Sequence, residues 1–238
     1  MLAISAVPGM GSGIVGLFVE SGWVGKGIVI LLMGFSVISW AMILLKYQYL
    51  RRAEKESHVF LTAFRKTKAV ADLLGHANAN KFSPLASLFT EGYREAESIV
   101  KSLPDRKVTD EDRPAITQEI DRALKITSQD EIVYLERYLA FLATTGTVAP
   151  LLGLFGTIWG IMDAFYGIGI KGAGDIGALA PGLAGALVTT IAGLFVAIPT
   201  VVAYNYFSEK IRDMATRMDS FSMEFLSFIE RSLLRSRS

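Results

Sequence analysis

The stretch that decides the fold is Ile176–Ser208, which reads IGALAPGLAGALVTTIAGLFVAIPTVVAYNYFS and contains no Asp, Glu, Lys or Arg. Two further stretches lack charged residues in the same way, Gly27–Leu45 and Tyr138–Met162. A helix rises about 1.5 Å per residue, so roughly 20 apolar residues cross a hydrocarbon core of about 30 Å. All three stretches are long enough, or nearly long enough, to cross this hydrocarbon core as a helix. The sequence therefore predicts an all-α integral membrane protein with three transmembrane helices.

The composition excludes several other classes of protein. Hydrophobic residues make up 51% of the 238 residues, and charged residues make up 20%, which is less than the usual share of about 25% in soluble domains. The net charge of +1 gives no reason to expect nucleic acid as a partner. The chain has no cysteine, which excludes disulfides and thiolate chemistry. Met1–Val19 contains no Lys or Arg, so it lacks the basic start of a cleaved signal peptide.

Basic residues near the ends of the spans predict the orientation. Ten lie on one side and two on the other, and the side with more basic residues is the cytoplasmic one. The N-terminus is therefore expected outside and the C-terminus in the cytoplasm. The ten are Lys46, Arg51, Arg52, Lys55, Arg122, Lys125, Arg137, Lys210, Arg212 and Arg217, and the two are Lys26 and Lys171.

These observations predict how the chain is divided. The expected transmembrane helices are 24–46, 138–165 and 178–207. On the periplasmic side we expect an N-terminal segment (1–23) and a loop (166–177). On the cytoplasmic side we expect a helical domain (47–137) and a C-terminal helix (208–238). Basic and acidic residues are nearly balanced in the cytoplasmic domain, which indicates solvated helical faces. Breaks at 75–83 and 104–114 predict helices over 47–73, 84–102 and 115–137. No helix breaker separates Pro114 from the second span, so one continuous helix is expected there.

Small residues recur every three or four positions in the second and third spans. This spacing lets helix backbones approach closely, and threonine hydroxyls can bond across the contact. We therefore expect these two spans to provide packing and pore surfaces, and the first span to be mainly a lipid-facing anchor. Proline inside a span is expected to kink it. The residues singled out are Gly146, Pro150, Gly153, Thr157 and Gly160 in the second span, and Gly182, Ala186, Thr189, Thr190, Gly193 and Pro199 in the third.

The cores of these two spans contain no ionisable residue. Asp163 lies at the outer end of the second span, where an interfacial position is favoured over a buried relay. Proton relays in membranes use Asp, Glu or His. If the chain conducts protons, Thr157, Thr189 and Thr190 are expected only to line the path, and the titrating carboxylate has to come from a partner helix.

The other candidate motifs indicate no catalytic, cofactor or metal site. Gly167, Gly169 and Gly172 fit the spacing of a dinucleotide fingerprint, which requires a strand before it and a helix after it. They are interpreted instead as loop glycines between two spans. His58 and His76 are isolated from any cluster of cysteines or carboxylates, so a surface or core role is favoured over metal binding. No catalytic residue, metal site or cofactor is predicted, and a membrane enzyme has neither a nucleophile nor paired carboxylates to support it.

Two segments, Thr147–Met162 and Ala180–Pro199 continuing to Asn205, resemble the hallmark of the MotA/TolQ/ExbB proton channel family. A weaker resemblance in Gly34–Trp40 and Phe221–Phe225 is more TolQ-like than ExbB-like. The resemblance implies a bacterial inner-membrane ring of five subunits around two helices of a TolR- or ExbD-like single-span partner. The membrane Asp of that partner is protonated and released in turn, with protons as the driving ion, and a TolA- or TonB-like protein is implied as a further partner.

The family threonines that face this Asp match Thr157 and Thr190. A hydroxyl can donate to a carboxylate and accept from a carboxylic acid, so it suits both protonation states. One position departs from the family pattern: the motif Ala-Pro-Gly-x-Ala-Glu often has glutamate where this chain has Gly185. The alternatives left open are a gliding-motility motor, a TonB-type uptake energiser, and a membrane scaffold that does not conduct.

Overall fold

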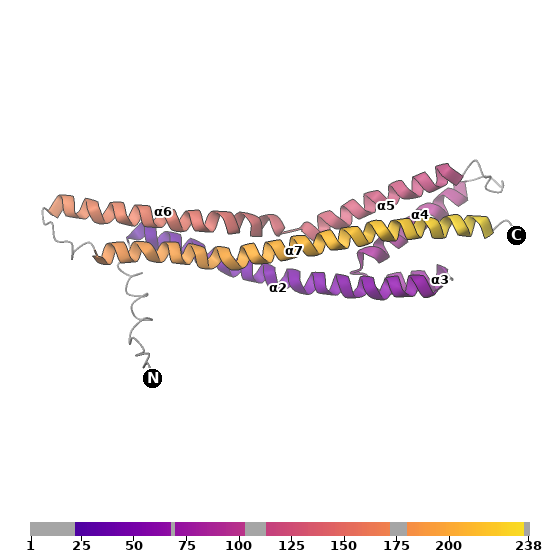
Figure 1. Ribbon diagram of the computed structural model, residues 1–238, viewed down its shortest axis with the longest axis horizontal. Coiled ribbons are helices and arrows are strands. Elements are labelled where there is room, and N and C mark those ends of the chain that lie inside the picture. The colour runs from indigo at the N-terminus through magenta and orange to yellow at the C-terminus, as the bar shows by residue number, and fades with distance from the viewer. Residues whose placement is uncertain (1–21, 68–69, 103–112, 172–179, 236–238) are drawn as a thin grey trace, which may run out of the picture. The chain divides into compact units, whose positions relative to one another are not determined.

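The computed structural model describes residues 22–67, 70–102, 113–171 and 180–235, and the statements below concern these residues (Figure 1). They contain helices and no strand, which confirms the all-α prediction for this part of the chain. The helices are α2 (Trp23–Lys66), α3 (Val70–Ala79), α4 (Pro84–Ser102), α5 (Arg113–Glu136), α6 (Leu139–Lys171) and α7 (Ala180–Arg235).

Three of these helices, α2, α6 and α7, are long and apolar enough to cross a membrane. Each of the three predicted spans falls on a different one of them, apart from residues 178–179, which lie outside the described residues. Most of the predicted N-terminal segment (1–21) lies outside them as well. The prediction of three spans is therefore confirmed by length and composition.

The chain forms two compact units. The first contains Met1–Ile43 and Tyr138–Asn205, and the second contains Leu44–Arg137 and Tyr206–Ser238. In the first unit α6 and α7 lie side by side, and α2 packs on them through Ile28 and Leu32, which contact Ala149, Val196 and Ala197 (Figure 1). Only 17% of the most apolar window of α2 is buried, against 39% for α6 and 33% for α7. This low burial agrees with the expectation that α2 mainly faces lipid.

The second unit has a core of phenylalanine rings. Phe60 and Phe64 of α2 lie against Phe89 of α4 and Phe221 of α7, with ring centroids 5.0–6.1 Å apart. Aromatic pairs at such distances contribute roughly 0.5–1.5 kcal/mol beyond the area they bury. This aromatic cluster explains why the charged part of the sequence forms a packed bundle.

The start of α4 agrees with the predicted helix at 84–102. Pro84 takes the first helical position, where its missing N–H is not needed. The Ser83 hydroxyl accepts a hydrogen bond from the Ala86 amide at 3.2 Å, and it also lies 3.1 Å from the buried hydroxyl of Ser57. Ser83 is therefore the N-cap of α4 and anchors it to α2.

The prediction of one helix over 47–73 with a break at 75–83 was wrong in its boundaries. Helix α2 ends at Lys66, and α3 continues through Gly75 to Ala79. Gly75 is exposed and is tolerated within the helix, at a cost of about 1 kcal/mol relative to alanine. The break begins instead at Asn80, whose side-chain amide donates to the His76 carbonyl at 2.8 Å and closes the last turn.

The prediction of a continuous helix from Pro114 into the second span was also wrong. Helix α5 ends at Glu136 and α6 begins at Leu139. Tyr138 between them has φ 72°, a left-handed conformation that is uncommon for residues other than glycine. The buried Lys46 ammonium donates to the Arg137 carbonyl at 3.2 Å. In a continuous helix the Arg137 carbonyl would accept a hydrogen bond from a backbone amide, but here it accepts from Lys46. No local sequence pattern predicts this contact.

Helix α6 extends further than expected. Residues 166–171, which were assigned to a loop, are helical, so Gly167 and Gly169 are helical residues and not loop glycines. The cost of glycine in a helix, about 1 kcal/mol each, does not end a helix that is otherwise apolar. Gly172 and the rest of the predicted loop, 172–177, lie outside the described residues.

Candidate functional site

Glycines bring the backbones of α6 and α7 into direct contact. A Cβ atom added to Gly153 would lie 2.8 Å from the Thr189 carbonyl oxygen, and one added to Gly193 would lie 2.5 Å from the Ala149 carbonyl oxygen. Both distances are shorter than a real Cβ contact allows. Each position therefore has room for glycine alone, because the obstacle is backbone and cannot rotate away.

The same contact continues along both helices. Gly146 lies against Val201, Gly160 against Ala186, and Gly182 against Ala164. As the residue number rises on α6 it falls on α7, so the helices run antiparallel. The sequence-selected residues Gly146, Gly153, Gly160, Gly182, Ala186 and Gly193 thus share one interface, while Pro150 and Pro199 are half-buried inside unbroken helices.

The three candidate threonines meet at the centre of this interface. The Thr189 hydroxyl lies 3.0 Å from the Gly153 carbonyl oxygen and 2.7 Å from that of Ala186. The Thr190 hydroxyl lies 3.1 Å from the same Gly153 carbonyl and 3.4 Å from the Thr157 hydroxyl. We call this set the threonine thread: Thr189, the Gly153 carbonyl, Thr190 and Thr157.

Within the thread, each hydroxyl has more than one possible partner. A hydroxyl carries one donor proton and two acceptor lone pairs. Thr190 can therefore donate to Gly153 or to Thr157, and Thr157 can donate to the Leu154 carbonyl at 2.7 Å. The thread can rearrange its hydrogen bonds without moving a helix, but neutral hydroxyls do not hold an excess proton.

Burial distinguishes the three side chains. Thr157 and Thr189 are only 6% and 1% exposed, whereas Thr190 is half-buried. Thr190 is therefore the threonine that another molecule can reach most directly. The single chain keeps the other two inside the α6–α7 interface.

Two features of the site escaped the sequence analysis. A Cβ atom on Gly156 would lie 2.5 Å from the Thr189 hydroxyl oxygen, so this glycine is as necessary to the contact as Gly153. Its position three residues after Gly153 was a usable signal. The second feature is a cavity of about 70 Å³ that Asp163, Gly185 and Thr189 all line. Nothing in the spacing of these residues, on two different helices, indicates that they share it.

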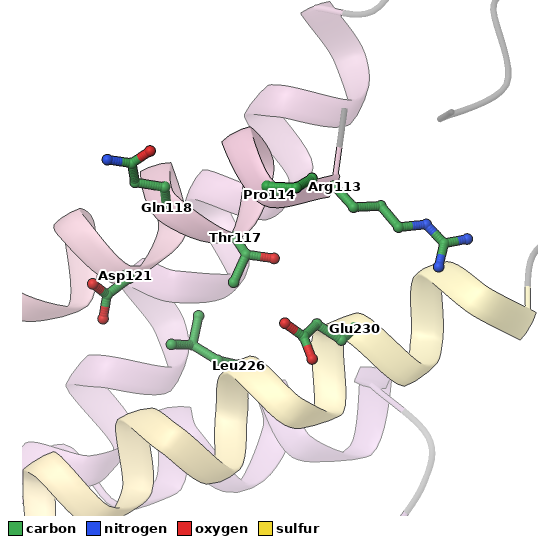
Figure 2. Close-up of a pocket in the computed structure, with 7 residues that line it drawn as sticks. All are labelled: Arg113, Pro114, Thr117, Gln118, Asp121, Leu226 and Glu230. Atoms are coloured by element: carbon green, nitrogen blue, oxygen red, sulfur yellow. The ribbon is translucent and has the colours of Figure 1, made fainter. Parts of the chain in front are cut away.

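The grooves of the second unit offer no comparable chemistry. Figure 2 shows one of about 530 Å³, between α5 and α7, lined by Arg113, Pro114, Thr117, Gln118, Asp121, Leu226 and Glu230. Its charges are of both signs, so it does not select a ligand by charge. His58 and His76 are exposed, and the described residues contain no group of three or more metal-binding side chains.

The sequence of the α6–α7 interface identifies the protein family to which the chain belongs. A profile of the MotA/TolQ/ExbB proton channel family matches residues 80–220, which include α6 and the apolar part of α7. The chain belongs to this family. It is 33% identical over 208 residues to the Tol-Pal system protein TolQ of Pseudomonas aeruginosa, with 87% of each chain covered. It is also 33% identical over 217 residues to the TolQ of Haemophilus influenzae, covering 90% of this chain and 92% of the relative.

Biopolymer transport proteins of the same family are similar as well. The biopolymer transport protein ExbB of Neisseria meningitidis serogroup A is 30% identical over 207 residues, which cover 82% of this chain and 87% of the relative. The predicted membership, with TolQ-like character, is confirmed. The family consists of membrane channel subunits that energise transport, and it is not a family of enzymes.

Proposed function

We propose that this protein is a motor or stator subunit that uses the proton-motive force to drive work at the bacterial envelope. Family membership and the identity to TolQ support a subunit of the Tol-Pal type. An uptake energiser of the ExbB type is the second candidate, since ExbB proteins are nearly as similar. The protein lies in the inner membrane with its N-terminus in the periplasm and its C-terminus in the cytoplasm.

Five copies form a ring around two helices of a TolR- or ExbD-like partner. The exposed apolar side chains of the first unit, such as Leu151, Ile158, Ile191 and Phe195, supply surface for neighbouring copies and lipid. The partner contributes the titrating Asp, because the described cores of α6 and α7 contain hydroxyls and no carboxylate. Protons are the driving ion, and no other cofactor is required.

The observation that carries this proposal is the pairing of Thr190 with Thr157. Half-buried Thr190 contacts the partner's Asp, and Thr157 lies behind it, 3.4 Å from the Thr190 hydroxyl. When the Asp is charged, Thr190 turns its proton from Gly153 to the carboxylate. When the Asp is protonated, Thr190 donates to Gly153 or Thr157 again and accepts from the acid.

The test is the double variant Thr157→Val/Thr190→Val, which keeps the side-chain shape and removes the hydroxyls. A hydrogen bond to a charged group contributes about 1.5–3 kcal/mol, so we expect proton flux to fall by roughly 10-fold or more. Flux is measured with a pH-sensitive dye in vesicles that contain the ring with its partner. Native mass spectrometry of the same sample should still show five copies of the chain.

Thr200→Val is the matched control. Thr200 is a buried threonine of α7 whose hydroxyl bonds only to Val196 of its own helix, at 2.7 Å, among the described contacts. Its loss should leave flux unchanged. Full flux in the double variant would refute a proton path along Thr157 and Thr190, whereas a wild-type complex without flux would favour a scaffold that does not conduct.

A further inference from the structure

A small cavity adjoins the threonine thread in the first unit. Most of its wall is glycine and alanine of α6, α7 and the start of α2, and the side chains with oxygen atoms in its lining are Asp163 and Thr189. Its volume is about 70 Å³, and one water needs roughly 10–15 Å³ measured in this way. The cavity therefore has room for several waters, with a hydroxyl on one part of its wall and a carboxylate on another.

The Asp163 carboxylate is open both to solvent and to this cavity. The side chain is exposed, and within the described residues no hydrogen bond or ion pair engages it. Lys26 follows Gly25 of the lining by one position, and no ion pair joins it to Asp163 among the described contacts. The carboxylate oxygens are therefore available as hydrogen-bond acceptors for water in the cavity.

Gly185 forms part of the wall of the cavity. It is a buried residue of α7 and contributes no side chain to the space that Asp163 borders from α6. Gly185 of α7 and Asp163 of α6 line the same cavity from two helices. The two positions are 22 residues apart in sequence but line one cavity.

Thr189 connects the cavity to the thread. Its hydroxyl lies 3.0 Å from the Gly153 carbonyl, which also accepts from Thr190. A polar route thus runs from Asp163 through water in the cavity as far as the Thr189 hydroxyl, which shares the Gly153 acceptor with Thr190.

We propose that Asp163 is the proton-binding group at the mouth of this route and supplies from α6 the carboxylate that Gly185 does not supply from α7. Its carboxylate binds a proton from outside water, becomes the neutral acid, and returns the proton to a water in the cavity. This inference rests on the proposed proton-channel function and extends it to the entrance of the path.

The experiment measures proton flux in vesicles containing the ring with its partner. Asp163→Asn keeps the shape and should lower flux by roughly 100-fold, the lower end of what a positioned proton-transfer group contributes. Asp163→Asn/Gly185→Glu returns a carboxylate to the cavity from α7, and Asp163→Asn/Gly185→Gln is its uncharged control. Asp163→Glu tests a carboxylate on α6 itself. Native mass spectrometry reports the number of subunits in every variant.

The inference is supported if Asp163→Asn loses flux with its ring intact, and if a carboxylate variant regains flux while the Gln control does not. It is overturned if Asp163→Asn conducts as well as wild type, or if no carboxylate variant restores flux. It is also overturned if the ring of Asp163→Asn dissociates, because Asp163 would then have a role in packing. A wild-type ring that conducts no protons would instead refute the proposed function, so the two failures are distinguishable.

Discussion

Single glycines determine how closely α6 and α7 approach each other. At Gly193 even one methyl group would meet the Ala149 carbonyl at 2.5 Å. At Gly34 of α2 nothing lies within 4 Å of an added Cβ atom. The two glycines lie in apolar helices of the same unit, yet a side chain has opposite consequences at the two positions.

We therefore expect Gly193→Ala to destabilise the first unit by about 1–3 kcal/mol, the usual cost of overpacking, because the helices have to separate. Gly34→Ala, which adds the same methyl group in open space, should raise stability by up to about 1 kcal/mol, the gain in helix propensity. Thermal unfolding in detergent, followed by the fluorescence of the tryptophans of the first unit, measures both variants. Equal midpoints for the two variants would contradict a backbone contact at Gly193.

At the scale of the element, helix boundaries depend on single polar contacts. Helix α4 begins where the Ser83 hydroxyl accepts a hydrogen bond from the Ala86 amide. Helix α5 ends next to Arg137, whose carbonyl accepts a hydrogen bond from Lys46 of α2. The Ser83 cap is local and was predictable from sequence, since serine and proline mark a helix start. The Lys46 contact joins residues 91 positions apart and had no sequence signal.

Ser83→Ala should weaken the first turn of α4 by about 1 kcal/mol, the typical cost of a lost N-cap. Hydrogen exchange of the amides in that turn should then speed up by roughly fivefold, since 1.36 kcal/mol corresponds to a factor of ten. Ser98→Ala, at an exposed position in the same helix, is the control and should not change exchange in the first turn. Unchanged exchange in Ser83→Ala would show that Pro84 and the packing on α2 suffice to start the helix.

At the scale of the whole molecule, single cysteines can report the orientation of the chain in the membrane. The chain has no cysteine, so each single-cysteine variant carries one thiol. Gly169, near the end of α6, has no atom within 4 Å of an added Cβ, and Ser98 on α4 is exposed. Both positions accept cysteine without disturbing a contact.

With the N-terminus outside, a membrane-impermeant maleimide should label Gly169→Cys from the periplasm and Ser98→Cys only after the inner membrane is opened. The cysteine-free parent is the control for background labelling. The reverse pattern would invert the topology, and labelling of both thiols from the same side would exclude a span between them.

The sequence by itself determined the three spans, the small-residue faces of α6 and α7, and the start of α4. Each of these depends on residues within a few helical turns, and hydrophobic length or spacing reports them directly. It also placed Gly153, Thr157, Thr189 and Thr190 among the candidates, since glycine in an apolar span allows close helix packing and threonine can form hydrogen bonds between helices.

The tertiary structure alone decided which of these residues meet. The Gly153 carbonyl accepts from both Thr189 and Thr190, and Asp163 shares a cavity with Gly185, because two antiparallel helices pack in one particular register. That register depends on contacts summed along the whole α6–α7 interface and on no single motif. For the same reason, an exposed aspartate that the sequence assigned to the edge of a span becomes a candidate for the entrance of the proton path.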